Sequence, residues 1–81
     1  MNKWIVYILE CNDKTLYTGI TNNIERRLYQ HETGVGAKYT KGRGPFKIIY
    51  KESCTDRSAA SIREAQIKQL KKEEKIKLCR T

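Results

Sequence analysis

The sequence has no long hydrophobic run and few cysteines, and each absence argues against a class of protein. Its longest apolar stretch, residues 4–9, falls far short of the roughly 18 residues that a membrane span needs. The first residues lack the cleavage site of a signal peptide, so we expect a cytoplasmic protein without a membrane role. The three cysteines, Cys11, Cys54 and Cys79, are odd in number and lack CxxC spacing, which argues against a disulfide framework or a zinc site.

Several catalytic patterns are absent as well. The sequence contains no serine or cysteine nucleophile with a matched base and no Walker or Rossmann glycine pattern. These absences disfavour acyl transfer and the common nucleotide-binding folds.

What the sequence does contain is positive charge. Its 81 residues include 17 Lys and Arg against 9 Asp and Glu, for a formal net charge of +8. That balance is typical of a nucleic-acid-binding protein, although lysines can also serve solubility alone. The length predicts a single domain over residues 1–81, with a small core that buries about 60% of the unfolded surface.

Apolar patterning predicts an α+β fold with the element order β-β-α-loop-β-α-α. A continuously apolar, β-branched segment at 4–9 indicates a central strand, and turn residues after it indicate a hairpin. A capping box at Asn22 and Glu25 begins a helix that ends near residues 33–34. We therefore expect a small, three-stranded, mostly antiparallel sheet flanked by helices. The remaining elements are strands at 15–20 and 46–51, a helix from a cap at Thr55 or Asp56 to about 70, and a helix at 71–78 anchored by Ile76.

The predicted hairpin brings two tyrosines together. A three-residue turn at 11–13 would place Tyr7 directly opposite Tyr17, and a two-residue turn at 12–13 would place it opposite Thr18. Cross-strand tyrosine pairs usually contribute packing, so the pair alone does not indicate catalysis.

Two helices carry polar groups inside apolar stripes. Arg27 and His31 share a helix face with Ile24 and Leu28, and either they extend to water at its edge or they reach a site beside the sheet. Glu64 falls at helical spacing between apolar residues of the later helix. It either forms an ordinary pair with the lysine four residues on or binds a divalent ion, and a single carboxylate suits Mg²⁺, which keeps most of its waters.

Two phenols, a guanidinium, an imidazole and a carboxylate together suit phosphodiester hydrolysis. At these residues the chain resembles the GIY-YIG endonuclease superfamily, in particular its short stand-alone bacterial members. The first motif corresponds to Ile5-Val6-Tyr7 and the second to Tyr17-Thr18-Gly19. Arg27 follows the second tyrosine by ten residues, and Glu64 follows Arg27 by 37, as in that family.

The resemblance implies metal-dependent cleavage of a DNA strand in a single step, with Mg²⁺ or Mn²⁺ as the ion. The leading hypothesis for this chain is a nuclease directed at a particular nucleic-acid structure or strand. The resemblance also implies that Glu64 holds the ion, Tyr17 activates water and Tyr7 orients that water or the phosphate. Arg27 would stabilise charge on the phosphate, with His31 assisting. Two motif positions depart from the family, with Ile5 in place of glycine and Thr18 in place of isoleucine.

A glycine-broken basic loop at 34–44 is the predicted binding segment. Lys38, Lys41 and Arg43 can contact phosphates and Tyr39 can stack on a base, while Gly19 adds a close backbone approach; the alternative is a plain connector. Larger family members carry extra DNA-binding or partner-binding domains, so a lone domain either cleaves weakly, needs a protein partner that supplies targeting, or only binds. The alternatives to a nuclease are a non-catalytic nucleic-acid-binding module and a small protein-interaction domain.

Overall fold

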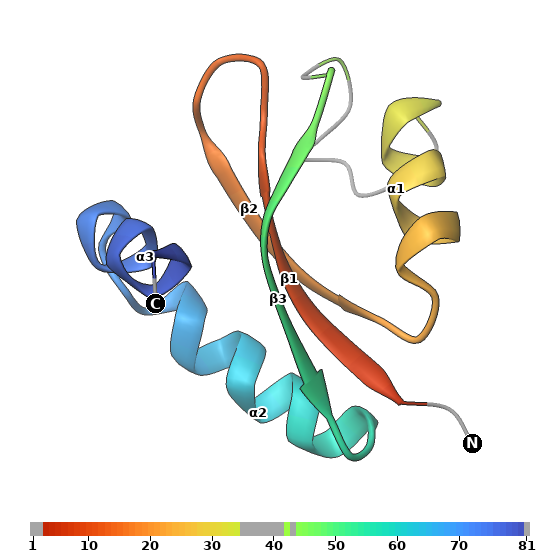
Figure 1. Cartoon of the computed structure of the whole chain (residues 1–81), viewed down its shortest axis with the longest axis vertical. Coiled ribbons are helices and arrows are strands. Elements are labelled where there is room, and N and C mark those ends of the chain that lie inside the picture. Colours follow the sequence, from red (N-terminus) through yellow and green to blue (C-terminus); the bar gives the residue numbers. More distant parts are fainter. Residues whose placement is uncertain (1–2, 35–41, 43, 81) are drawn as a thin grey trace.

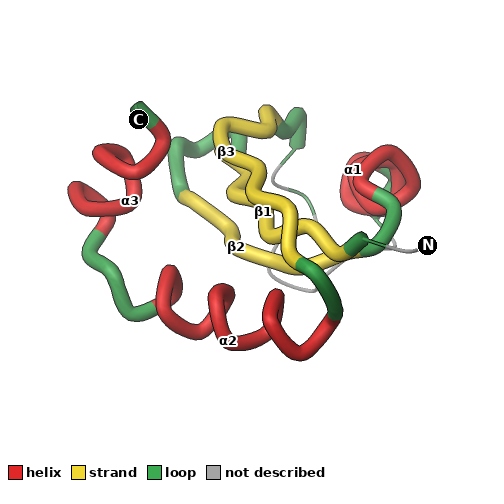
Figure 2. Tube along the Cα trace, turned by 60° about the horizontal axis from the view of Figure 1, so that its bottom comes forward, coloured by secondary structure: helices red, strands yellow, loops and turns green. Residues whose placement is uncertain are grey.

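The computed structural model describes residues 3–34, 42 and 44–80, which form one sheet with helices on both faces (Figures 1 and 2). The sheet is antiparallel and has the strand order β2-β1-β3. The predicted α+β class and element order are confirmed. No helix among the described residues is long and apolar enough to cross a membrane. In chain order the elements are β1 (Trp4–Glu10), β2 (Leu16–Thr21), α1 (Ile24–Glu32), β3 (Lys47–Cys54), α2 (Arg57–Lys68) and α3 (Lys72–Cys79).

The central strand β1 is buried on both faces, as its continuous apolar run predicts. Val6 and Ile8 are fully buried on one face, and Tyr7 and Leu9 are buried on the other. Because successive strand residues point to opposite faces, these pairs meet different helices. The strand therefore separates two environments.

The helices divide between those two environments. Figures 1 and 2 show α1 on one side of the sheet and α2 with α3 on the other. Ala60 and Ile67 of α2 pack with Val6 and Ile8 in the main hydrophobic cluster. On the opposite face, the buried residue of α1 is His31.

The hairpin register differs from both predicted registers. Tyr7 lies opposite Gly19, and Tyr17 lies opposite Leu9, so neither expected partner of Tyr7 is correct. Tyr7 and Tyr17 still share a face, because residues two apart on a strand point the same way. They form a diagonal pair.

The turn explains the shift. The Lys14 backbone N–H donates to the Cys11 carbonyl over 2.9 Å, and the Cys11 N–H donates to the Thr15 carbonyl over the same distance. Lys14 itself has a left-handed φ of 69°. The three-residue loop is therefore residues 12–14, one residue later than the predicted loop, and a left-handed lysine carries no warning in the sequence.

Further details of the helices and strands also differ from prediction. Asn23, not Asn22, caps α1: its side chain accepts a hydrogen bond from the Arg26 N–H over 3.0 Å. The strand β3 continues to Cys54, because its last residues pair with the start of β1. The predicted anchor of α3, Ile76, is 36% exposed, so that prediction is wrong; Leu78 and Cys79 at the end of α3 pack on the core instead.

Candidate active site

The site is built on the face of the hairpin that α1 covers. The phenol of Tyr7 lies across the strand over Gly19, and the ring centroids of Tyr7 and Tyr17 are 6.4 Å apart. A Cβ atom at Gly19 would lie 2.6 Å from the Tyr7 hydroxyl. Gly19 is thus required by packing, because only a residue without a side chain lets the phenol lie so close to the backbone.

His31 comes from the last turn of α1 and completes an aromatic cluster. Its Nε2 atom is hydrogen-bonded to the Tyr7 hydroxyl at 3.0 Å. Its ring centroid lies 5.2 Å from that of Tyr17 and 5.9 Å from that of Phe46. Burial, and then the positive charge of Arg27, lower the pKa of His31 from 6.5 to about 4, so the imidazole is neutral at pH 7.

Arg27 brings the positive charge to the two phenols. Burial lowers the pKa of Arg27, but hydrogen bonding and charge interactions with Tyr7 and Tyr17 outweigh it and raise the pKa overall. A further hydrogen bond joins Arg27 Nη1 to Gln30 Oε1 over 3.1 Å and orients the guanidinium. The predicted stripe of α1 is therefore confirmed as the face turned to the sheet.

The two tyrosines have different surroundings. Tyr7 is 1% exposed, and burial raises its pKa although hydrogen bonding to Arg27 opposes that effect. Tyr17 is only half-buried and lines a surface cavity. Of the two hydroxyls, that of Tyr17 is thus the one nearer to solvent and to any substrate.

Glu64 reaches this cluster from another direction. The roles that the family resemblance implies require the tyrosines, Arg27 and Glu64 to line one concave face, but the helix that carries Glu64 covers the opposite face of the sheet (Figure 1). Its carboxylate is half-buried and lies 3.4 Å from the Lys68 Nζ. It still raises the pKa of Tyr7 electrostatically, so its charge is felt at the phenol.

The fit of a divalent ion rests on this one carboxylate. Among the described residues there is no cluster of three potential protein ligands. A single half-buried carboxylate does fit an ion such as Mg²⁺, which takes most ligands from water and phosphate. The ion pair with Lys68 would have to open for Glu64 to bind it.

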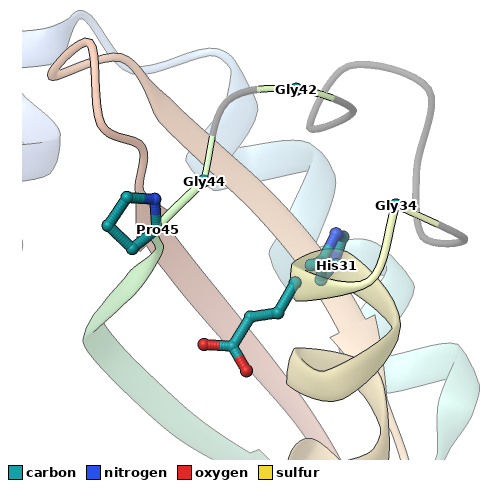
Figure 3. Close-up of a pocket in the computed structure, with 6 residues that line it drawn as sticks. His31, Gly34, Gly42, Gly44 and Pro45 are labelled. Carbon is teal, nitrogen blue, oxygen red and sulfur yellow. The ribbon is translucent and has the colours of Figure 1, made fainter.

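A cavity of about 390 Å³ lies at the end of α1 (Figure 3). His31 projects into it, so the histidine that holds Tyr7 also borders this space. In the sequence, the glycine-rich composition of residues 34–44 is the feature that corresponds to this cavity. The other lining residues are Glu32, Gly34, Gly42, Gly44 and Pro45. The predicted binding residues Lys38, Tyr39, Lys41 and Arg43 lie outside the described residues.

Two further residues escaped the sequence analysis. Lys51 lies opposite Tyr7 on β3 and is exposed, so it adds a cation to the same face. Thr18 is 3% exposed and points to the other face, opposite Ile8. Its hydroxyl has no hydrogen-bond partner among the described residues, an arrangement that costs about 1–3 kcal/mol in a folded protein. In the sequence, the departure from the family motif at Thr18 was the only sign of this buried hydroxyl.

Comparison with known proteins matches residues 3–77 to the GIY-YIG catalytic domain. A UPF0213 protein of Oceanobacillus iheyensis is 58% identical over 73 residues, 90% of this chain and 85% of that protein. The solution NMR structure of a UPF0213 protein from Bacillus halodurans superposes with a TM-score of 0.60 at 41% identity, covering 94% of this chain and 81% of that one. An NMR structure from E. faecalis gives a TM-score of 0.65 at 37% identity, covering 96% of this chain and 84% of that one.

Proposed function

The chain belongs to the GIY-YIG family, and from that premise we propose that it hydrolyses phosphodiester bonds in DNA with the help of a divalent ion, Mg²⁺ or Mn²⁺. The domain is of nuclease type, its family acts on nucleic acid, and GIY-YIG nucleases generally use divalent metal ions. DNA as the substrate and Mg²⁺ as the ion are our proposals. So is a preference for a branched or single-stranded structure.

The observation that carries the proposal is the cluster of Tyr7, Tyr17, Arg27 and His31 on one face of the hairpin. Arg27 interacts with both phenols, and His31 holds one of them through its 3.0 Å hydrogen bond. Burying a guanidinium and an imidazole costs free energy that an apolar contact would avoid. A site that must stabilise a phosphate supplies the reason for keeping both.

The residues divide the work according to their surroundings. Tyr17, half-buried and interacting with Arg27, is the group that takes the proton of the attacking water. Arg27 also binds a nonbridging phosphate oxygen as negative charge builds up. Tyr7, buried against neutral His31, positions the reacting groups.

A divalent ion held by Glu64 would supply positive charge for the phosphate and for the leaving oxygen. Lys68, the ion-pair partner of Glu64, lines a cavity with residues of β2, and the Glu64 charge influences Tyr7. Glu64 is therefore the residue whose replacement separates cleavage from binding.

The deciding experiment incubates the chain with branched, single-stranded and duplex DNA in Mg²⁺ or Mn²⁺. Glu64→Gln should abolish cutting and leave affinity equal or slightly higher, because it removes a negative charge near phosphate. Glu25→Gln, an exposed carboxylate in the first turn of α1, is the matched control and should cut like the parent.

A non-catalytic nucleic-acid-binding module is the second candidate, and one observation favours it. The Glu64 carboxylate is already paired with Lys68, as a structural salt bridge would be. Tight binding without cutting under either metal would establish this alternative. Cutting by Glu64→Gln at the parent rate would remove the metal role of that residue.

A further inference from the structure

The cavity of about 390 Å³ at the end of α1 takes no part in the proposed hydrolysis (Figure 3). Its volume falls within the roughly 300–1,000 Å³ of pockets that hold small ligands, whereas the cavities beside β2 and beside the hairpin turn measure about 280 and 190 Å³. His31 belongs both to this cavity and to the tyrosine cluster, and its ring centroid lies 5.2 Å from that of Tyr17. A group in the cavity would therefore lie next to a phosphate held at Tyr17.

The charge at this cavity is negative, although the whole chain carries a net charge of +8. Glu32 lines the cavity and is exposed, and no hydrogen bond or ion pair joins its carboxylate to another residue of the described chain. The last turn of α1, which carries the negative end of the helix dipole, contributes the lining from Glu32 and His31. Neither Lys nor Arg is among the described lining residues, and His31 is neutral at pH 7. The cavity therefore disfavours phosphate and favours a ligand that donates hydrogen bonds.

The other lining residues leave room for a flat ligand. Gly34, Gly42 and Gly44 expose backbone without side chains, which lets a ligand lie close to the main chain. A Cβ atom at Gly34 or Gly42 would have no described atom within 4 Å, so the space beside these two residues is open. Pro45 adds an apolar ring to the lining. A planar ring with hydrogen-bond donors on its edge, such as a nucleobase, matches both the shape and the charge of this cavity.

We propose that this cavity binds a nucleobase with an exocyclic amino group, such as cytosine, from the nucleotide beside the phosphate at Tyr17 and Arg27. The proposal rests on the proposed function for the strand that carries the base. The Glu32 carboxylate accepts a hydrogen bond from the amino group, as acidic side chains do from N4 of cytosine. Thymine has the O4 carbonyl oxygen in the place of that amino group, and the carboxylate repels it. Glu32 is therefore the residue that makes binding depend on the base.

The test is a binding measurement in EDTA, where no cleavage occurs, with fluorescein-labelled single strands of ten deoxycytidines and of ten thymidines. The parent should bind the deoxycytidine strand about fivefold more tightly, the lower end of the discrimination that a side chain reading a base edge provides. Glu32→Gln keeps the shape of the side chain, but its amide can accept from cytosine and donate to thymine. The ratio of the two affinities should therefore fall towards one in this variant.

The control is Glu25→Gln, which removes the same charge from an exposed carboxylate in the first turn of α1, outside the cavity. Both variants should bind both strands slightly more tightly, because each loses a negative charge that repels phosphate, but Glu25→Gln should keep the ratio of the parent. An unchanged ratio in Glu32→Gln, or an equal change in both variants, would overturn the proposal.

A second measurement locates the base and needs no variant. In the parent, the NMR amide signals of Gly34 and Gly44 should shift when the deoxycytidine strand binds, and unshifted signals would place the base elsewhere and overturn the proposal.

The outcomes also separate this inference from the function on which it rests. If the chain cuts no DNA in Mg²⁺ or Mn²⁺ but the ratio of affinities depends on Glu32, the nuclease proposal fails and the base-binding cavity stands. If the chain cuts DNA and the ratio does not depend on Glu32, the base-binding proposal alone fails.

Discussion

The two faces of the sheet bury different kinds of side chain. Beneath α2, the buried contacts join Val6 and Ile8 to Ala60 and Ile67, and all four are fully buried and apolar. Beneath α1, the most buried contact joins Tyr7 to His31 through a hydrogen bond. Tyr7 and His31 are almost as deeply buried as the four apolar residues, but they carry polar groups that can take part in chemistry.

That difference separates stability from chemistry. Apolar contacts supply the driving force for folding, about 25 cal/mol for each Å² removed from water. A buried phenol and imidazole need matched partners and contribute less. In so small a chain, the apolar face must therefore supply most of the stability of the whole fold. Substitutions on the two faces should differ in how much they change the free energy of unfolding.

The largest effect is expected on the apolar face. Ile67→Ala should reduce the free energy of unfolding by about 2–5 kcal/mol, because it leaves a cavity at a fully buried position. Urea unfolding measures this reduction in the free energy of unfolding. Ile67→Val, which removes one methylene, should cost only about 0.5–1.5 kcal/mol and retain the properties of the tyrosine face. A loss below 1 kcal/mol in Ile67→Ala would show that α2 is not the main support of the sheet.

The stability contributed by His31 should depend on pH. Its pKa is about 4 in the folded protein and 6.5 in the unfolded chain, so the unfolded chain binds more protons between these values. Stability should therefore be constant above about pH 7 and fall as the pH drops towards 4, by at most about 3 kcal/mol from this group.

The variant His31→Gln isolates that contribution from the carboxylates that titrate in the same range. The difference in unfolding free energy between parent and variant should narrow steadily from pH 7 to pH 4. Parallel curves would mean that His31 is not held neutral by burial and Arg27.

These expectations show what the sequence could predict and what it could not. Helical spacing alone placed Arg27 and His31 on the inner face of α1, because periodicity reports which residues share a face. It could not report which face of the sheet α2 would cover. In the structure α2, which carries Glu64, covers the face opposite to α1 (Figure 1). The hairpin register was out of reach because it depends on a left-handed Lys14, a conformation usually signalled by glycine or asparagine.

A smaller effect is expected at Gly19. Gly19→Ala should cost about 1–3 kcal/mol and break the hydrogen bond between Tyr7 and His31, because the new Cβ would lie 2.6 Å from the phenol oxygen. Thermal unfolding gives the cost, and the NMR signals of His31 report the broken bond. Gly44→Ala is the control, since its Cβ would meet Phe46 at an ordinary 3.4 Å. Equal costs for the two alanines would contradict the close packing at Gly19.

The smallest effect tests an electrostatic link between the two faces. Glu64 raises the pKa of Tyr7, after the larger contributions of burial, Arg27 and Tyr17, although its helix covers the other side of the sheet. Glu64→Gln should therefore lower the pKa of Tyr7 slightly and leave it above its ordinary value, because burial remains. Ultraviolet titration of the phenols, with Tyr17→Phe as background, measures the change on Tyr7 alongside the other tyrosines. Glu73→Gln on α3, whose charge does not act on Tyr7, should leave that pKa where it is. If the two glutamine variants titrate alike, the carboxylate of Glu64 does not reach the cluster, and an ion bound to it could not act on a phosphate held there.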